Sequence, residues 1–378
     1  MLDNKIHLCR ANLAFATREH LAALAYGSNK KEIKLCQANF LDTTFSDRRF
    51  KRSKFLLLGN YKTRDSFLKH VERSESKAIF LQSPYVDHYP DWFLDLHDSA
   101  SLAYSGYSLS LVDYFEGQYG SHLVKNSKYL LAGSHDEYRN YVKYGSKNSI
   151  VVLTGNPLMY TLRRRMTFNS NPRNENQILL WAPHWIEEWE TNGKGFARWE
   201  TALRSVLTFA EQNIDKKVIV RPHPLLRNVI DAYLNHNSEI LNRESRNAAL
   251  SDSVTEILPK MKKLLELRNV ELSNASMMED VLSADILITE GVSIIGYWAA
   301  TGKPILVLRD SLSPNFNAEG EQLLLATEQA SDAVDILNWI RRISSLPPTK
   351  LNTELIELSQ TLHPTFKTSP IDLVAKHM

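Results

Sequence analysis

The stretch Asp280–Asp310, DVLSADILITEGVSIIGYWAATGKPILVLRD, decides the fold of this chain. Two short apolar runs within it, Ile286–Thr289 and Ile305–Leu308, flank a segment with the length and composition of a helix. Apolar runs this short are typical of central strands in a parallel sheet that is covered on both faces. The stretch therefore predicts strand, loop, helix and strand in succession, which is the repeating unit of an α/β protein.

The loop Thr289–Ser293 lies at the carboxyl end of the first of these strands and opens the helix. Open α/β sheets bind ligands at this edge, where free backbone N–H groups and the helix dipole favour anions. Two more predicted strands, Ile178–Ala182 and Lys217–Val220, lead into the polar loops Pro183–Trp185 and Arg221–Pro224. Parallel strands end at one edge of their sheet, so we expect the three loops to converge on a ligand that carries phosphate.

In the rest of the chain, short apolar runs also alternate with helical segments. Further strands are predicted at Phe55–Leu58, Ala78–Gln82, Tyr129–Ala132, Ile150–Leu153 and Val270–Leu272. The longer predicted helices are Asp65–Glu72, residues 133–145, Arg198–Gln212, Asp252–Leu267 and Gln329–Ser345. This alternation favours parallel sheets throughout.

A chain of 378 residues is long for one core, so two domains are the natural expectation. The stretch 163–177 is polar and rich in Asn, as is typical of a linker between domains. We therefore predict an N-terminal domain over 1–162, a linker over 163–177 and a C-terminal domain over 178–345. The tail 346–378 begins with Leu346 and two prolines, and one possible course for it is back across the first domain.

Composition excludes several classes of protein. A net charge of only +2 does not indicate a dedicated nucleic-acid binder. The two cysteines, Cys9 and Cys36, provide neither a metal spacing nor a disulfide framework, which fits a reducing cytoplasm. Neither a signal peptide nor an apolar run long enough to span a membrane is recognisable. Basic clusters at 47–54 and 163–165 leave contact with an anionic membrane surface open, although solvated faces are the favoured explanation.

Side chains in the three loops suit the binding of a diphosphate. Arg221 offers a planar fork of N–H donors. His223, between two prolines, can donate to a phosphate oxygen or act as a general acid or base, and the alternative is a packed turn histidine. Thr289 and Ser293 supply hydroxyls to an anion cradle, and Glu290 can accept from ribose hydroxyls.

Other candidates carry a structural alternative beside the functional one. His184 follows Trp181 and precedes Trp185, so it either binds the donor or stacks on aromatic neighbours. Gly291 is expected to be required by its backbone conformation whether or not a ligand binds. Lys303 either binds the donor or is the cation at a helix C-terminus. No metal is expected, because His, Cys and acidic residues lack the spacing of a metal site.

At these loops the chain resembles a known family. The segments VIVRPHPLL (218–226) and ADILITEGVSIIGYWAATGKPILVL (284–308) look like the C-terminal half of the CDP-glycerol glycerophosphotransferase family, whose members build teichoic acids and related capsule polymers. ILLWAPHW, YLLAGSHDEYRNYVKYG followed by VVLTGNP, FLQSPYVDHYP and LAYSGYSLSL are similar to further landmarks of its capsule-associated branch. The resemblance runs from Ala78 to Leu308 and is stronger in the second half.

The resemblance implies a GT-B fold: two Rossmann-like domains facing a cleft, with the donor nucleotide on the second domain and the acceptor on the first. It implies metal-independent transfer without a cofactor. The family's second-domain histidine matches His223, with Arg221 beside it, and its acidic-aromatic-Ser-Ser loop falls on Glu290–Ser293, where only the second serine is kept. The Trp-His-Gly element of teichoic-acid members is absent, and Asp87 or His88 is the expected substitute as catalytic base.

We therefore expect a transferase that moves a glycerol-phosphate, polyol-phosphate or sugar unit from a CDP- or CMP-type donor to a cell-surface glycan of a capsule, teichoic acid or lipopolysaccharide. The expected partners are the nucleotide-activated donor and a glycan or lipid-linked glycan acceptor, without nucleic acid. The expected location is the cytoplasm, with contact to the inner face of the membrane left open. The alternatives are a glycosyltransferase that uses another nucleotide sugar, and a non-catalytic GT-B-like subunit of a glycan synthase.

Overall fold

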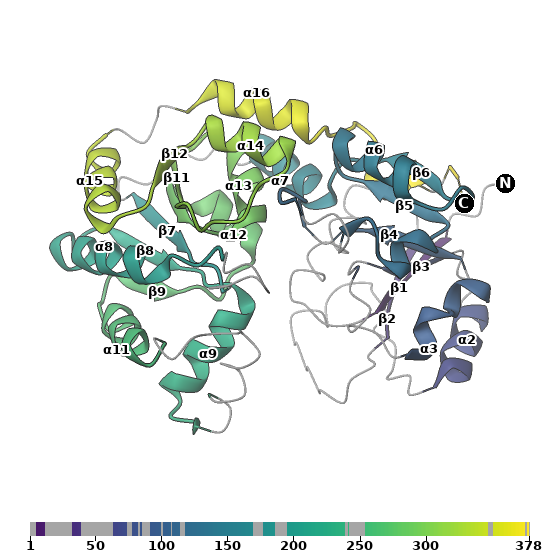
Figure 1. The fold of residues 1–378 in the computed structure, drawn as a ribbon, viewed down its shortest axis with the longest axis horizontal. Helices are drawn as coiled ribbons and strands as arrows, with labels where there is room; N and C mark the ends of the chain where they lie inside the picture. The colour runs from purple at the N-terminus through teal and green to yellow at the C-terminus, as the bar shows by residue number, and fades with distance from the viewer. Residues whose placement is uncertain are drawn as a thin grey trace. The chain divides into compact units, whose positions relative to one another are not determined.

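The chain divides into two compact units. Unit 1 comprises residues 1–110, 114–163 and 362–378, and unit 2 comprises 111–113 and 164–361. The computed structural model describes residues 5–11, 32–38, 63–73, 78–81, 84, 91–99, 101–106, 108–113, 118–168, 177–185, 195–238, 241, 254–346, 351–374 and 376–377. Each unit has a six-stranded sheet in which every pair of neighbouring strands is parallel (Figure 1). This confirms the predicted α/β class with two parallel sheets.

The sheet of unit 1 has the strand order β2-β1-β3-β4-β5-β6. Its strands are β1 (Lys5–Ala11), β2 (Glu32–Ala38), β3 (Ala78–Leu81), β4 (Leu102–Ser105), β5 (Tyr129–Ala132) and β6 (Ile150–Leu153). The helices are α2 (Arg64–Arg73), α3 (Asp91–Leu94), the 3₁₀ turn η3 (Leu96–Asp98), α5 (His122–Lys125), α6 (His135–Tyr144), α7 (Pro157–Phe168) and α17 (Pro370–Val374). Helix α7 continues past the boundary of the unit at residue 163.

The sheet of unit 2 has the strand order β12-β11-β10-β7-β8-β9. Its strands are β7 (Ile178–Ala182), β8 (Lys217–Val220), β9 (Val270–Leu272), β10 (Ile286–Thr289), β11 (Ile305–Leu308) and β12 (Glu328–Ala330). The helices are α8 (Trp199–Gln212), α9 (Pro224–Leu234), α11 (Val254–Leu265), α12 (Met277–Ser283), α13 (Val292–Ala299), α14 (Ala318–Leu325), α15 (Ala333–Ser344) and α16 (Thr353–Leu362).

The strand order of unit 2 reverses once, between β7 and β10. The chain builds outward from β7 to β8 and β9, then returns to the other side of β7 and builds β10, β11 and β12. Ala182 and Thr289, the last residues of β7 and β10, are paired in register. The loops that follow these strands leave the same edge and diverge, which is the topological switch point where open α/β sheets bind ligands.

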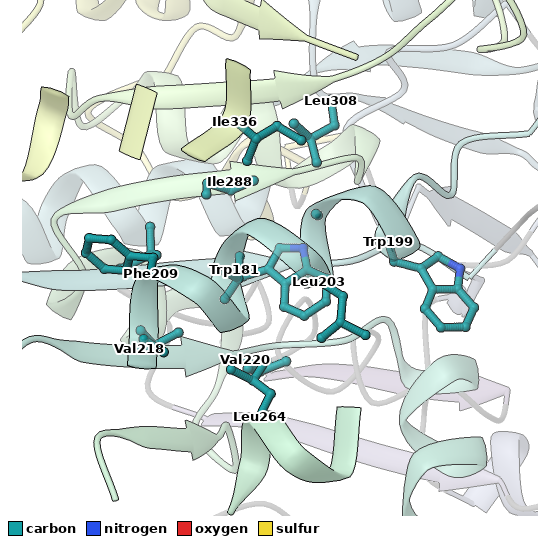
Figure 2. Packing of buried hydrophobic residues seen from close by; sticks show 14 of the residues in the cluster. Trp181, Trp199, Leu203, Phe209, Val218, Val220, Leu264, Ile288, Leu308 and Ile336 are labelled. Atoms are coloured by element: carbon teal, nitrogen blue, oxygen red, sulfur yellow. The ribbon is translucent and has the colours of Figure 1, made fainter. Parts of the chain in front are cut away.

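A large apolar core fixes the position of that edge. Helices α8, α11 and α15 lie on one side of the sheet, and α12, α13 and α14 lie on the other (Figure 1). Figure 2 labels Trp181 of β7 together with Leu203 of α8 and Val220 of β8, all of them 0% exposed. Full burial of a large apolar side chain contributes about 1.5–3 kcal/mol, so this cluster holds the central strands firmly.

Several predicted elements need correction. Helix α15 does not begin at Gln329, because residues 328–330 form the edge strand β12; Asp332 then caps the helix by accepting from the backbone N–H groups of Val334 and Asp335. Strands β1 and β2 were not predicted, because basic and polar residues interrupt their apolar pattern. The first six residues of the predicted linker form the end of α7. The predicted strand Phe55–Leu58 lies outside the described residues.

The C-terminal segment is anchored to unit 1 by an arginine that the sequence placed in a basic surface cluster. Arg163 donates from Nη1 to the carbonyl oxygen of His363 at 2.7 Å and to Oγ1 of Thr365 at 3.3 Å. This side chain is therefore used within unit 1 and not for a solvated basic face. None of the described helices is long and apolar enough to cross a membrane.

Candidate functional site

The ends of β7, β8 and β10 bring the three predicted loops together at the switch point. The ladder between β7 and β8 continues past both strands, because Arg221 N–H donates to Trp181 O at 2.8 Å and His223 N–H donates to Pro183 O at 3.0 Å. Across the switch point, the backbone N–H of His184 donates to Oε2 of Glu290 at 2.9 Å. Main-chain geometry therefore fixes the spacing of all three loops.

Thr289 holds the β10 loop and is not exposed to a ligand. Its hydroxyl donates to Ala182 O at 2.8 Å and accepts from the Gly291 N–H at 2.7 Å, and the residue is 0% exposed. We expected this hydroxyl to contact the donor, but in the structure it links the β7 and β10 loops instead. Ser293 is half-buried in the first turn of α13.

Gly291 is the N-cap of α13, and its φ of −73° is open to any residue. The expectation that backbone conformation requires glycine here is wrong. Space is the physical reason instead, because a Cβ at this position would lie 3.1 Å from Oγ1 of Thr289. With glycine as N-cap, the first turn of α13 has no side-chain cap, which leaves a helix N-terminus suited to an anion at the switch point.

Arg221 is anchored through one nitrogen of its fork. Nη1 donates to Oδ2 of Asp280 at 2.7 Å and to Ala275 O at 2.9 Å. Asp280 is buried and also accepts from Oγ of Ser273 at 2.5 Å. Nε and Nη2 of Arg221 have no hydrogen-bond partner in the part of the chain that the structure describes. The anchor thus orients the guanidinium and leaves two nitrogens for a ligand.

His223 caps helix α9 and is held as one tautomer. Its Nδ1 accepts from the backbone N–H of Leu225 at 3.3 Å, so the proton of the neutral ring lies on Nε2. The surrounding protein excludes water from the half-buried ring, and this desolvation lowers the pKa of His223 to about 3. At neutral pH the side chain is therefore a hydrogen-bond donor, which favours phosphate binding over general acid–base catalysis.

His184 lies in an aromatic group. Its ring centroid is 5.0 Å from that of Phe196, 5.3 Å from that of His223 and 6.2 Å from that of Trp185, which it stacks on. Burial, with a smaller contribution from His223, lowers the pKa of His184 well below its ordinary value. The ring is thus neutral, and the stacking alternative describes what the structure shows.

Lys303 is fully engaged as a helix cap. Its Nζ donates to the carbonyl oxygens of Val281 and Leu282, each at 2.9 Å, and to that of Ala284 at 2.5 Å. These carbonyls end α12, and an ammonium group has three N–H donors in total. The geometry favours the helix C-terminal role over donor binding.

The site residues predicted from sequence and those of the structure differ in two respects. Asp87 and His88 lie outside the described residues. Asp280, Ser273 and Phe196 belong to the site but were not singled out from the sequence. Only one signal pointed to the first two: Ser276 and Glu279 form a capping box that marks the start of α12 and hence the loop before it. Within the described ranges, no group of three His, Cys, Asp or Glu side chains is placed to hold a metal ion.

No protein-family model matches this sequence, and no curated protein matches it. Solved structures match almost the whole chain. A UDP-GlcNAc 2-epimerase from Neisseria meningitidis bound to UDP-GlcNAc aligns with a TM-score of 0.57 and 12% identity over 98% of both chains. The S. aureus MnaA structure with UDP aligns with a TM-score of 0.56 and 11% identity over 99% of this chain and 95% of that one.

The wall teichoic acid polymerase TagF, in a variant soaked with CDPG, aligns with a TM-score of 0.54 and 10% identity over 100% of this chain and 88% of that one. At identities this low the similarity shows the fold alone. Together with the two parallel sheets, it confirms the GT-B fold that the sequence resemblance implied.

The capping role of Lys303 gives a test that separates it from donor binding. Lys303→Met should lower the free energy of unfolding by about 2–4 kcal/mol, because three carbonyl oxygens lose their partner in a buried place. Urea denaturation followed by tryptophan fluorescence measures this loss. Lys263→Met, which removes an exposed lysine paired with Glu211, is the matched control and should change stability little. Unchanged stability together with lost nucleotide binding would contradict the capping role.

Proposed function

We propose that this protein is a transferase that binds the phosphates of a CDP- or CMP-type donor at the switch point of unit 2. It would move a glycerol-phosphate, polyol-phosphate or sugar unit to a cell-surface glycan or lipid-linked glycan. One arrangement mainly supports this: the free nitrogens of Arg221 and the Nε2–H of His223 lie on the single loop that follows β8, at the same edge of the sheet where α13 begins.

The hydrogen-bond donors that remain free at the site can stabilise a leaving phosphate. When the bond to the leaving nucleotide phosphate breaks, negative charge develops on its oxygens. The fork of Arg221, the Nε2–H of His223 and the first turn of α13 are fixed donors that stabilise this charge without reorganisation. With its pKa lowered to about 3 and its Nδ1 used by Leu225, His223 takes up no proton near neutral pH, so another group must accept the proton of the acceptor hydroxyl. Asp87 or His88 remains our proposed base, on sequence grounds.

Two lines of support point to the donor class. Three of the solved structures that share the fold were obtained with UDP-GlcNAc, UDP or CDPG. The RPHP and ITEGVS segments resemble the CDP-glycerol glycerophosphotransferases, which favours a cytidine nucleotide. In the phosphotransfer version the acceptor hydroxyl attacks the β-phosphorus and CMP leaves. In the glycosyl version the hydroxyl attacks the anomeric carbon and the nucleotide leaves with its phosphate. We place the enzyme in the cytoplasm, with its lipid-linked acceptor at the inner face of the membrane.

A thermal-shift panel of CMP, CDP, UDP, GDP, CDP-glycerol and UDP-GlcNAc tests the donor site, because a ligand that binds only the folded state raises its stability. We expect CDP and CDP-glycerol to stabilise the wild type. Arg221→Ala should weaken CDP binding by about 10- to 100-fold through the loss of charge-assisted hydrogen bonds.

Arg204→Ala, which removes an exposed arginine paired with Glu200, is the control for lost positive charge. Arg221→Lys is the second variant, since it retains a cation for the buried Asp280 but lacks the fork. CDP affinity within twofold of wild type in a folded Arg221→Ala protein would contradict the site. Stabilisation by UDP and UDP-GlcNAc alone would point to a different nucleotide-sugar enzyme, and no shift at all would favour a non-catalytic subunit.

His223→Asn separates catalysis from folding. Asparagine is a good N-cap and can still accept from the Leu225 N–H, but it cannot place an N–H where Nε2 lies. We expect turnover, measured as CMP released from CDP-glycerol in the presence of acceptor, to fall by about 10²- to 10³-fold while the melting temperature is retained. His236→Asn, at an exposed histidine with a φ of 53°, is the matched control. Near wild-type turnover of His223→Asn would remove His223 from the proposed mechanism.

A further inference from the structure

Glu290 is a buried carboxyl group at the centre of the site with one unsatisfied oxygen. It follows β10 directly and precedes Gly291, the N-cap of α13. The residue is 2% exposed, and its Oε2 accepts from the His184 N–H across the switch point. Its Oε1 is buried without a hydrogen-bond partner in the described part of the chain. A side chain placed like this is poorly suited to accept from ribose hydroxyls.

The charges around Glu290 leave it without a counter-ion. Arg198, at the start of α8, binds Asp310 through two hydrogen bonds, Nε to Oδ2 at 2.7 Å and Nη2 to Oδ1 at 2.6 Å. The imidazole rings of His184 and His223, from the β7 and β8 loops, are neutral because burial lowers the pKa of each. The charge and backbone N–H of Arg198 and the indole of Trp181 still favour the ionised carboxylate, but burial disfavours it more, so the neutral acid is the preferred form.

We propose that Glu290 is a positioning residue that joins the β7 and β10 loops as a neutral carboxylic acid, and that its ionisation weakens binding of the donor phosphates. The second clause rests on the proposed function; the first rests on the structure alone. A neutral acid keeps the hydrogen bond to His184 while placing no negative charge beside the first turn of α13. An ionised Glu290 would repel a phosphate bound there.

A protonated Glu290 makes the free energy of unfolding depend on pH. Burial raises the pKa of Glu290 from 4.5 to about 8, and the backbone N–H groups of His184 and Arg198, the charge of Arg198 and the indole of Trp181 oppose this shift only in part. The folded protein then keeps a proton that the unfolded chain has lost. This contribution to stability is fully present below pH 4.5 and declines as the pH rises to about 8, beyond which it is lost. Phosphate affinity should decline at still higher pH, as the folded state itself loses the proton.

Stability measurements test the neutral acid without any ligand. Glu290→Gln keeps an oxygen for the His184 N–H and cannot ionise, and Glu271→Gln, at an exposed carboxyl paired with Lys217, is the matched control. Melting temperatures are recorded from pH 5 to 9 for both variants and for wild type. We expect Glu290→Gln to gain stability relative to wild type as the pH rises to about 8, with a constant difference above that. A difference that does not change with pH would overturn the proposal.

Calorimetric titration with CDP from pH 6.5 to 9.5 tests the consequence for the site. In wild type the Kd should increase by about tenfold per pH unit above the midpoint. Glu290→Gln should lack this increase, and Glu271→Gln should retain it. Parallel profiles for wild type and Glu290→Gln would overturn the link to phosphate binding. If CDP binds no variant at any pH, the proposed function fails, and the stability measurements still decide the state of Glu290.

Discussion

The hydrogen bond from the His184 backbone N–H to the Glu290 carboxyl joins the loops that follow β7 and β10, the two parallel strands on either side of the switch point. Crossovers from β7 and β10 lead to opposite sides of the sheet, so the loops at their ends separate. The Thr289 hydroxyl adds a second link between these strands by donating to Ala182 O. These two links hold the loops after β7 and β10 in fixed positions on either side of the switch point. The polar side chains of the site lie around these loops.

A division between anchored and free polar groups gives the site its chemistry. Arg221 has one nitrogen bound by the buried Asp280 and two left over, and His223 caps α9 with Nδ1 and keeps Nε2–H. The hydroxyl of Thr289 and the ammonium group of Lys303 are used within the protein. Donors that are already oriented lose little entropy when an anion binds, which is why the geometry favours phosphate. Because both histidines are neutral, this recognition does not depend on the protonation of a histidine near pH 7.

Much of unit 2 could be predicted from sequence, because its central strands are mostly buried and read as continuous apolar runs; β7, β8, β10 and β11 begin and end at the predicted residues. The edge strand β12 was missed because Glu328–Ala330 has no apolar run. Loop convergence followed from parallel topology, but the partners of each side chain did not. Nothing in the sequence indicated that Arg221 binds Asp280, that Lys303 caps α12, or that the Glu290 carboxyl accepts from the His184 N–H. Such pairings depend on tertiary distances, which residue spacing does not encode.

A crystal structure of the protein soaked with CDP would reveal the proposed donor site. Phosphate oxygens should lie within hydrogen-bond distance of Nε or Nη2 of Arg221 and of Nε2 of His223, beside the first turn of α13. The Nη1 bond from Arg221 to Asp280 should persist in that complex. A nucleotide bound elsewhere on the chain, or one whose phosphates do not contact Arg221 and His223, would contradict the proposed donor site.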